Sequence, residues 1–231
     1  MVSVCVTTYN GEKHIEEQLR SILSQLGDTD EVIVSDDGSD DHTLSIIHRI
    51  ADSRVSIYHN TGKKGVIHNV ENALGKAKGD YIFLSDQDDV WLPTKVACSL
   101  KGLQEAPLVV SDCYVTDENL QIVHDSFFAV NRSKQNKYLA LLKNPYLGCC
   151  MAFHRSLLEL VLPFPDHIPM HDIWIGNVAA FRRSTKFLPD KLIYYRRHGN
   201  NVTTTSEKSK NGFIDKVIFR MHVLKNLLIK R

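Results

Sequence analysis

Four short runs of apolar, mostly β-branched residues occur in the first 85 positions, and each ends abruptly in a polar break. Runs of this kind are typical of parallel strands buried on both faces. The expected strands occupy residues 2–7, 31–35, 54–59 and 80–84. Between them apolar residues recur at helical spacing, which predicts helices at about 12–25, 42–51 and 66–78. Repeated strand–turn–helix units predict an α/β domain with a parallel sheet.

The second half has a less regular pattern and predicts a mixed sheet. Pro93 is expected to open a helix, since proline is tolerated best in the first helical turn. Residues 127–143 are polar and expected to be irregular or partly helical. Strands are expected at 107–114, within 115–123 and 144–153, and at 187–188 and 192–196. Helices are expected at 155–162 and after the segment 169–174, the second running to about 183.

Composition narrows the class of protein. The chain has 231 residues, 43% hydrophobic and 24% charged, which is typical of a soluble globular domain. No apolar stretch approaches the about 20 residues that a membrane-spanning helix needs. The net charge is +1, and no basic patch with interleaved aromatic residues lies outside the tail. Nucleic acid is therefore not an expected partner.

The cysteines and the N-terminus favour a cytoplasmic protein. The five cysteines are odd in number and lack the spacing of metal ligands, so no disulfide framework is expected. Cys149 and Cys150 lie in an apolar run and are predicted to be buried free thiols, as in a reducing compartment. Met1 leads directly into a strand-like run, so no signal peptide is expected.

Carboxylates gather where the fourth predicted strand ends. Asp86, Asp88 and Asp89 fall within four positions. Ligands of open α/β sheets bind at the carboxyl ends of the strands, and clustered carboxylates repel one another unless a cation or donors neutralise them. The Asp-x-Asp spacing places two oxygens within reach of one hard divalent ion, which substrate phosphates can complete. We therefore expect a nucleotide diphosphate to bind at this point.

Two other strand ends are also polar. Asp36 and Asp37 follow the second strand, where a helix-capping role and a nucleotide-binding role are about equally favoured. Right-handed crossovers would place Asn10, Asp36 and Asp86 along one edge of the sheet. The loop 60–65 is glycine-rich and basic but is not a P-loop, and a plain surface loop is favoured there. No Gly-x-Gly-x-x-Gly follows the first strand, which disfavours a dinucleotide-binding domain.

Five short motifs occur in a familiar order. They are Thr7–Gly11, Asp36–Ser39, Ser85–Trp91, His171–Asp172 and Tyr195–Thr203. Together they resemble family 2 inverting glycosyltransferases, especially bacterial O-antigen and capsule rhamnosyl- and glucosyltransferases. The resemblance implies an α/β fold of the GT-A type, a Rossmann-like, mostly parallel but mixed sheet flanked by helices. It covers 1–205, with a nucleotide-sugar-binding half at 1–105 and an acceptor-binding half at 106–205.

The resemblance also implies a role for individual residues. Nucleotide-sugar binding would fall to Thr8, Tyr9, Asn10, Asp36, Asp37 and Asp86. Asp88 would bind Mg²⁺ or Mn²⁺ on the donor diphosphate, with Asp86 and His198 as further ligands. Metal ions stabilise the negative charge that grows on a departing diphosphate.

Asp172 matches the carboxylate that serves as general base in this family. A single base and a single displacement invert the anomeric centre. The acceptor-side or supporting residues would be Asp89, Trp91 and His171. On their own, His171 and Asp172 could instead be a helix N-cap with a neighbouring imidazole, and Trp91 favours core packing. For Arg196 and Arg197, phosphate neutralisation and a solvated basic edge are both open.

The tail at 206–231 is predicted to be a basic amphipathic helix. Its apolar stripe consists of Ile214, Val217, Ile218, Met221, Leu224 and Leu228. Contact of residues 213–231 with an anionic membrane surface, which would place the protein peripherally at the inner face of the plasma membrane, is slightly favoured. The alternative is a terminal helix that packs on the domain or on a second subunit.

Together these features predict a metal-dependent inverting glycosyltransferase. Its donor would be a UDP- or dTDP-linked hexose or deoxyhexose, and its acceptor a hydroxyl of a glycan or lipid-linked glycan intermediate. Two rivals are a nucleotidyltransferase and a non-catalytic nucleotide-sugar-binding protein. The first would need a basic triphosphate loop that Thr8–Gly11 lacks, and the second would have lost Asp88 or Asp172.

Overall fold

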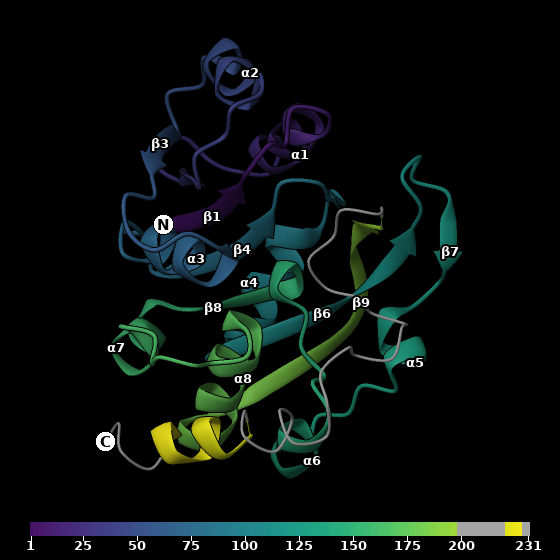
Figure 1. Ribbon diagram of the computed structural model, residues 1–231. Helices are drawn as coiled ribbons and strands as arrows, with labels where there is room; N and C mark the ends of the chain where they lie inside the picture. The colour runs from purple at the N-terminus through teal and green to yellow at the C-terminus, as the bar shows by residue number, and fades with distance from the viewer. Residues whose placement is uncertain (198–219, 228–231) are drawn as a thin grey trace.

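The first apolar run forms β1 (Val2–Thr8), a central strand in which every residue is buried or nearly so (Figure 1). It pairs in parallel with β2 (Glu31–Asp36) and with β4 (Tyr81–Asp86), and β2 pairs in parallel with β3 (Val55–His59). The computed structural model describes residues 1–197 and 220–227. The predicted parallel strands of the first half are all present, which confirms the interpretation of the apolar runs.

The second half extends the same sheet with antiparallel pairs. The strands there are β5 (Val90–Trp91), β6 (Leu108–Thr116), β7 (Ile122–His124), β8 (Met151–His154) and β9 (Thr185–Arg196). Their order is β3-β2-β1-β4-β8-β6-β9-β5, with β7 paired to β6. β8 is antiparallel to both β4 and β6, whereas β9 is parallel to β6. The prediction of a mixed, mostly parallel α/β sheet is therefore confirmed.

Two predicted strands need correction. The expected strands at 187–188 and 192–196 are one continuous strand, β9. Leu188 pairs with Ser111 and Lys191 with Asp112, so Pro189 and Asp190 bulge out of the ladder. The expected strand within 144–153 is shorter, because Gly148–Cys150 forms a 3-10 turn, η1, before β8.

The helices of the first half follow the predicted apolar stripes. They are α1 (Ile15–Leu23), α2 (Thr43–Ile50), α3 (Val66–Leu74) and α4 (Lys95–Leu103). Ile15, Leu19 and Ile22 of α1 are completely buried. α3 ends at Leu74, with Gly75 as its C-cap, before the predicted end of the helix. Pro93 lies in the turn before α4 rather than at its first position, which corrects that prediction.

The helices of the second half are shorter, apart from α8. They are α5 (Phe127–Asn131), α6 (Lys137–Leu142), η2 (Arg155–Leu157), α7 (Leu158–Val161) and α8 (His171–Arg182). Trp174 on α8 is completely buried, and its indole N–H donates to the Val161 carbonyl at 2.9 Å. α6 lies beside α8, because Tyr138 meets Phe181 edge-on with ring centroids 5.9 Å apart. Cys149 and Cys150 are buried free thiols, as predicted.

Within the tail, residues 220–227 are helical and lie at the base of the domain (Figure 1). Val223 and Leu227 are buried in the core, whereas Met221 and Leu224 are exposed. The helix therefore packs on the domain through a face other than the predicted apolar stripe. The remaining stripe residues and His198 lie outside the described residues. No helix within 1–197 or 220–227 is long and apolar enough to cross a membrane.

Candidate active site

The polar strand ends of β1, β2 and β4 meet at one edge of the sheet, as predicted. In the parallel register, Thr8 lies opposite Asp36 and Thr7 lies opposite Asp86. The carboxyl ends of three adjacent parallel strands therefore bring the candidate nucleotide-binding and metal-binding segments together.

The loop after β1 is tied to the carboxylate loop by Gln87, a residue that the sequence did not single out. Gln87 Oε1 accepts hydrogen bonds from Thr8 Oγ1 at 2.7 Å and from the Tyr9 N–H at 2.8 Å. Its Nε2 donates to the Tyr9 carbonyl at 3.0 Å. Tyr9 itself is 56% exposed. One amide side chain thus fixes the candidate nucleotide loop against the candidate metal loop.

Asn10 fastens the same loop to the segment after β2. It has a left-handed backbone, with φ of 49°, which asparagine tolerates better than most residues. Its N–H donates to Ser39 Oγ, and its Oδ1 accepts from the Asp40 N–H. The loops that follow β1 and β2 are therefore linked to each other by hydrogen bonds.

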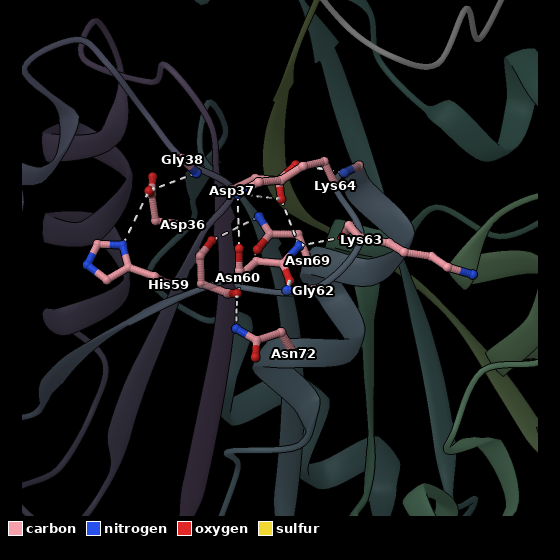
Figure 2. A network of polar contacts seen from close by, with 12 residues as sticks. Asp36, Asp37, Gly38, His59, Asn60, Gly62, Lys63, Lys64, Asn69 and Asn72 are labelled. Atoms are coloured by element: carbon pink, nitrogen blue, oxygen red, sulfur yellow. Dashed lines mark hydrogen bonds and ion pairs between the residues drawn. The ribbon is translucent and has the colours of Figure 1, made fainter.

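Asp36 and Asp37 are engaged in separate networks (Figure 2). The Asp36 carboxylate is 1% exposed and accepts hydrogen bonds from the N–H groups of Gly38 and Ser39 and from Ser39 Oγ. This arrangement shapes the turn, whose Gly38 has φ of 95°. The Asp36 carboxylate is thus buried and accepts three hydrogen bonds within its own turn. Its contact with a nucleobase stays a prediction.

Asp37 holds the loop 60–65 against the strand edge. Its carboxylate accepts from Asn60 Nδ2 and from the Gly65 N–H, each at 2.7 Å, and Lys64 Nζ lies 3.9 Å away. Asn60 is buried, and its carbonyl accepts from Lys64 Nζ at 2.9 Å (Figure 2). The segment favoured above as a plain surface loop is therefore fixed to the edge of the site.

Carboxylates of the loop after β4 form a cluster that a cation would stabilise. Among the described residues, ligand atoms of Asp86, Asp89 and Cys149 lie within 4.8 Å of one another. Burial, with the charges of Asp88 and Asp172, raises the pKa of Asp86 to about 7. Burial and the charges of Asp88 and Asp86 raise the pKa of Asp89 well above its ordinary value. Like charges crowded in a buried site have this effect on carboxyl groups.

This donor set fits a divalent ion. In the described part of the chain, Asp89 Oδ2 is buried without a hydrogen-bond partner, while Oδ1 accepts from the Arg196 N–H at 3.0 Å. A buried carboxylate oxygen left unpaired is costly unless a cation or a donor reaches it.

Asp88, the metal ligand favoured from the sequence, is not in the group of Asp86, Asp89 and Cys149, so its metal role stays a prediction. It is 8% exposed, and its charge acts on Asp86 and Asp89. Cys149 also lies in this group, but the hydrogen bond with Cys150 and burial raise the pKa of its thiol well above the ordinary value. A neutral thiol does not suit Mg²⁺ or Mn²⁺, so the two carboxylates are the better ligands.

Arg196 is a structural clamp, and its burial corrects the expectation of a solvated basic edge. The side chain is 4% exposed and contacts protein groups. Its guanidinium donates to the Asp88 carbonyl at 2.8 Å, the Glu118 carbonyl at 2.6 Å and the Glu17 carboxylate at 2.5 Å. Charge-assisted hydrogen bonds of this kind fix the carboxylate loop against the end of β9.

Asp172 lies in the first turn of α8 and faces the same cluster. It is 5% exposed, and its charge contributes to the raised pKa of Asp86. Its Oδ2 accepts from Asn144 Nδ2 at 3.2 Å, a contact that the sequence interpretation missed. Burial raises the pKa of Asp172, while the charge of His171 and the hydrogen bond from Asn144 act in the opposite direction. A raised pKa suits a carboxylate that accepts a proton during catalysis.

His171 is buried beside Asp172 and packs against the chain at Gly148. Burial lowers the pKa of His171, which favours the neutral imidazole. A Cβ at Gly148 would lie 2.6 Å from His171 Nε2, so the glycine leaves room for the ring. His171 therefore packs at the start of α8, and its acceptor-side or supporting role stays a prediction.

Trp91 lies in the core beneath the site. It is 3% exposed and packs against Phe83, with ring centroids 5.6 Å apart. The buried Lys95 ammonium lies 4.7 Å from the Trp91 ring centroid and donates to the Cys149 carbonyl. This burial supports the packing interpretation of Trp91 and leaves it a supporting role.

Gly11 is expected to be essential for the link through Gln87. A Cβ at Gly11 would lie 2.4 Å from Gln87 Oε1, so Gly11→Ala would displace the amide that joins the two loops. We expect nucleotide affinity to fall about tenfold, as for the loss of one or two hydrogen bonds, measured by titration with UDP. Gly75→Ala, whose Cβ meets its nearest neighbour at 3.5 Å, is the control.

A double variant separates this effect from general damage. Gln87→Ser in the Gly11→Ala background removes the clash, so the two losses should be less than additive. Strict additivity, or unchanged UDP affinity in Gly11→Ala, would show that Gln87 does not position the nucleotide loop.

The architecture is that of GT-A glycosyltransferases. The chain is 21% identical to S. aureus TarS in complex with UDP-GlcNAc, with a TM-score of 0.74 over 99% of this chain and 67% of that chain. It is 27% identical to the mannosyltransferase PcManGT from Pyrobaculum calidifontis in complex with GDP-Man and Mn²⁺, with a TM-score of 0.69 over 87% of this chain and 58% of that chain. Both solved chains are longer, and the fold class predicted from sequence is confirmed.

The chain belongs to glycosyl transferase family 2, whose model matches residues 3–162. It is 28% identical to the Escherichia coli UDP-Glc:alpha-D-GlcNAc-diphosphoundecaprenol beta-1,3-glucosyltransferase WfaP, over 100% of this chain and 88% of the relative. The protein is thus a glycosyltransferase, and the comparisons give the nucleotidyltransferase alternative no support.

Proposed function

We propose that this glycosyltransferase moves a hexose or deoxyhexose from a UDP- or dTDP-sugar, with inversion, to a hydroxyl of a lipid-linked glycan intermediate. The observation that carries the proposal is the position of Asp172. A buried carboxylate on α8 acts electrostatically on Asp86, whose strand end adjoins the candidate nucleotide loop. A candidate base and candidate diphosphate ligands therefore share one site.

Asp172 would remove the proton from the attacking acceptor hydroxyl. Its Oδ2 is oriented by Asn144, and its Oδ1 accepts from the Ile173 N–H at 2.6 Å. General base catalysis by a positioned carboxylate contributes about 10²–10⁴-fold to the rate. One base and one displacement invert the anomeric carbon, and no covalent nucleophile is required.

Asp86, Asp88 and Asp89 would hold a Mg²⁺ or Mn²⁺ ion on the donor diphosphate. Such an ion stabilises negative charge on the leaving group. Asp89 Oδ2, buried without a partner among the described residues, supplies one oxygen for this purpose. His198 stays a candidate ligand from the sequence resemblance. Thr8, Tyr9, Asn10, Asp36 and Asp37 would line the nucleotide end of the donor.

The proposed acceptor is taken from the name of a relative, WfaP. WfaP acts on a GlcNAc-diphosphoundecaprenol, and the present chain aligns with that enzyme along its whole length. An acceptor anchored in a membrane would place the reaction at a membrane surface, with the protein bound peripherally.

A donor screen tests the proposal. UDP-glucose, UDP-GlcNAc and dTDP-rhamnose would each be incubated with a prenyl-diphosphate-linked GlcNAc, with Mn²⁺, with Mg²⁺ or with EDTA. We expect nucleotide release and a new glycosidic product with at least one donor, and none with EDTA. Turnover in EDTA would contradict the metal role, and retention at the anomeric carbon would contradict the single displacement.

A further inference from the structure

A hollow of about 200 Å³ with a mostly apolar lining surface opens between the end of α5 and α6, and basic residues are among those that line it. Its lining includes Arg132, Lys134 and Lys143, together with Leu139, Leu142 and Asn144. No Asp or Glu occurs from Ser126 to Leu158, so no acidic residue of this segment offsets the charge. Arg132 and Lys134 are exposed, and Lys143 Nζ donates to the Asn131 carbonyl. Exposed basic side chains beside a mostly apolar hollow suit a ligand that joins a phosphate or diphosphate to a hydrocarbon chain.

Two exposed apolar side chains belong to the lining of the same hollow. Leu139 is 43% exposed and Leu142 is 61% exposed. Arg220 donates to the carbonyls of Leu141 and Leu142, which brings the helical segment 220–227 beside α6. Met221 and Leu224 of that segment are 64% and 41% exposed. Basic groups next to a group of exposed apolar side chains fit a ligand that has an anionic head and a hydrocarbon tail.

The hollow is connected directly to the candidate base. Asn144 belongs to its lining and donates to Asp172 Oδ2 at 3.2 Å. α6 runs beside α8, with Tyr138 against Phe181 near one end and Asn144 against Asp172 near the other. A ligand in the hollow would therefore contact Asn144, the residue that donates to Asp172.

We propose that Arg132, Lys134 and Lys143 bind the diphosphate of a prenyl-linked acceptor, and that Leu139 and Leu142 contact the first part of its lipid chain. The inference rests on the proposed function, because it gives a place to the acceptor named there. The acceptor sugar spans the distance from this hollow to Asp172, so the diphosphate determines which hydroxyl meets the base.

Binding of farnesyl diphosphate and of inorganic pyrophosphate to the UDP-loaded full chain tests the subsite. Arg132→Gln/Lys134→Gln should weaken both ligands about tenfold, because charge-assisted hydrogen bonds are lost. Leu139→Ser/Leu142→Ser should weaken farnesyl diphosphate and leave pyrophosphate unchanged. Lys78→Gln/Lys101→Gln removes two exposed charges elsewhere and is the matched control. Unchanged affinity for UDP shows that each variant is folded.

Wild-type affinity of Arg132→Gln/Lys134→Gln for farnesyl diphosphate would overturn the subsite. So would equal weakening in the Lys78→Gln/Lys101→Gln control, since the effect would then follow net charge alone. With a prenyl-diphosphate-linked GlcNAc, the acceptor KM of Arg132→Gln/Lys134→Gln should rise about tenfold. An unchanged acceptor KM would reject the subsite and leave the transferase function intact. Failure of the wild type to use any lipid-linked acceptor would reject the proposed acceptor, and the subsite with it.

Discussion

Asp172→Asn is expected to lower the rate of sugar transfer by about 10²–10⁴-fold and to leave donor binding near the wild-type value. Asparagine preserves the shape of the side chain, and the Asn144 amide can still donate to its Oδ1 in place of the carboxylate oxygen. It cannot accept the proton of the attacking hydroxyl. The measurement is the initial rate of product formation at saturating donor, with UDP affinity determined separately by titration.

The pH profile gives a second readout of the same residue. Burial raises the pKa of Asp172 above its ordinary value of 3.8. A base acts only when ionised, so the rate should fall as pH drops through this raised pKa. Asp190→Asn, an exposed carboxylate on β9, is the control and should leave both the rate and the profile unchanged. Transfer by Asp172→Asn within threefold of the wild type would mean that the base lies elsewhere.

The strand-end residues could be predicted from the sequence for a simple physical reason. Apolar runs locate parallel strands, and right-handed crossovers place their carboxyl ends at one edge. Once β1, β2 and β4 are adjacent, the positions of Thr8, Asp36 and Asp86 follow from the parallel register. Local patterning and a general topological rule together determine this half of the candidate site.

Long-range polar contacts could not be predicted in this way. Arg196 follows a short apolar run and precedes a polar loop, which is typical of an exposed residue. Its partners at Asp88, Glu118 and Glu17 are 78 to 179 residues away, and no periodic pattern connects them. The contacts of Gln87 and Asn144 could not be predicted for the same reason, because each is made by a single side-chain amide to a residue far away in the sequence. The continuity of β9 was hidden by Pro189 and Asp190, which suggest a break but form a bulge.

Asp88→Asn is expected to lower the rate of Mn²⁺-supported transfer by about 10³-fold, because several kcal/mol of leaving-group stabilisation depend on the ion. In the metal-free protein, however, the same substitution should increase thermal stability. The charge of Asp88 helps to raise the pKa of Asp86 to about 7 from 3.8 and also raises that of Asp89. Removing that charge relieves repulsion, so metal-free Asp88→Asn should unfold at a higher temperature than the wild type at pH 8.

The dependence of thermal stability on pH separates this mechanism from simple damage. A carboxyl group with a raised pKa binds more protons in the folded state, so the metal-free wild type should lose stability as pH rises from about 4 through about 7. Mn²⁺ neutralises the ionised cluster and should raise the melting temperature more at pH 8 than at pH 5. Asp88→Asn should reduce both effects, whereas Asp190→Asn should reduce neither. If Mn²⁺ raised the melting temperature equally in the wild type and in Asp88→Asn, the cluster would not be the metal site. The ion would then bind equally well without the carboxylate of Asp88, whose charge raises the pKa of both Asp86 and Asp89.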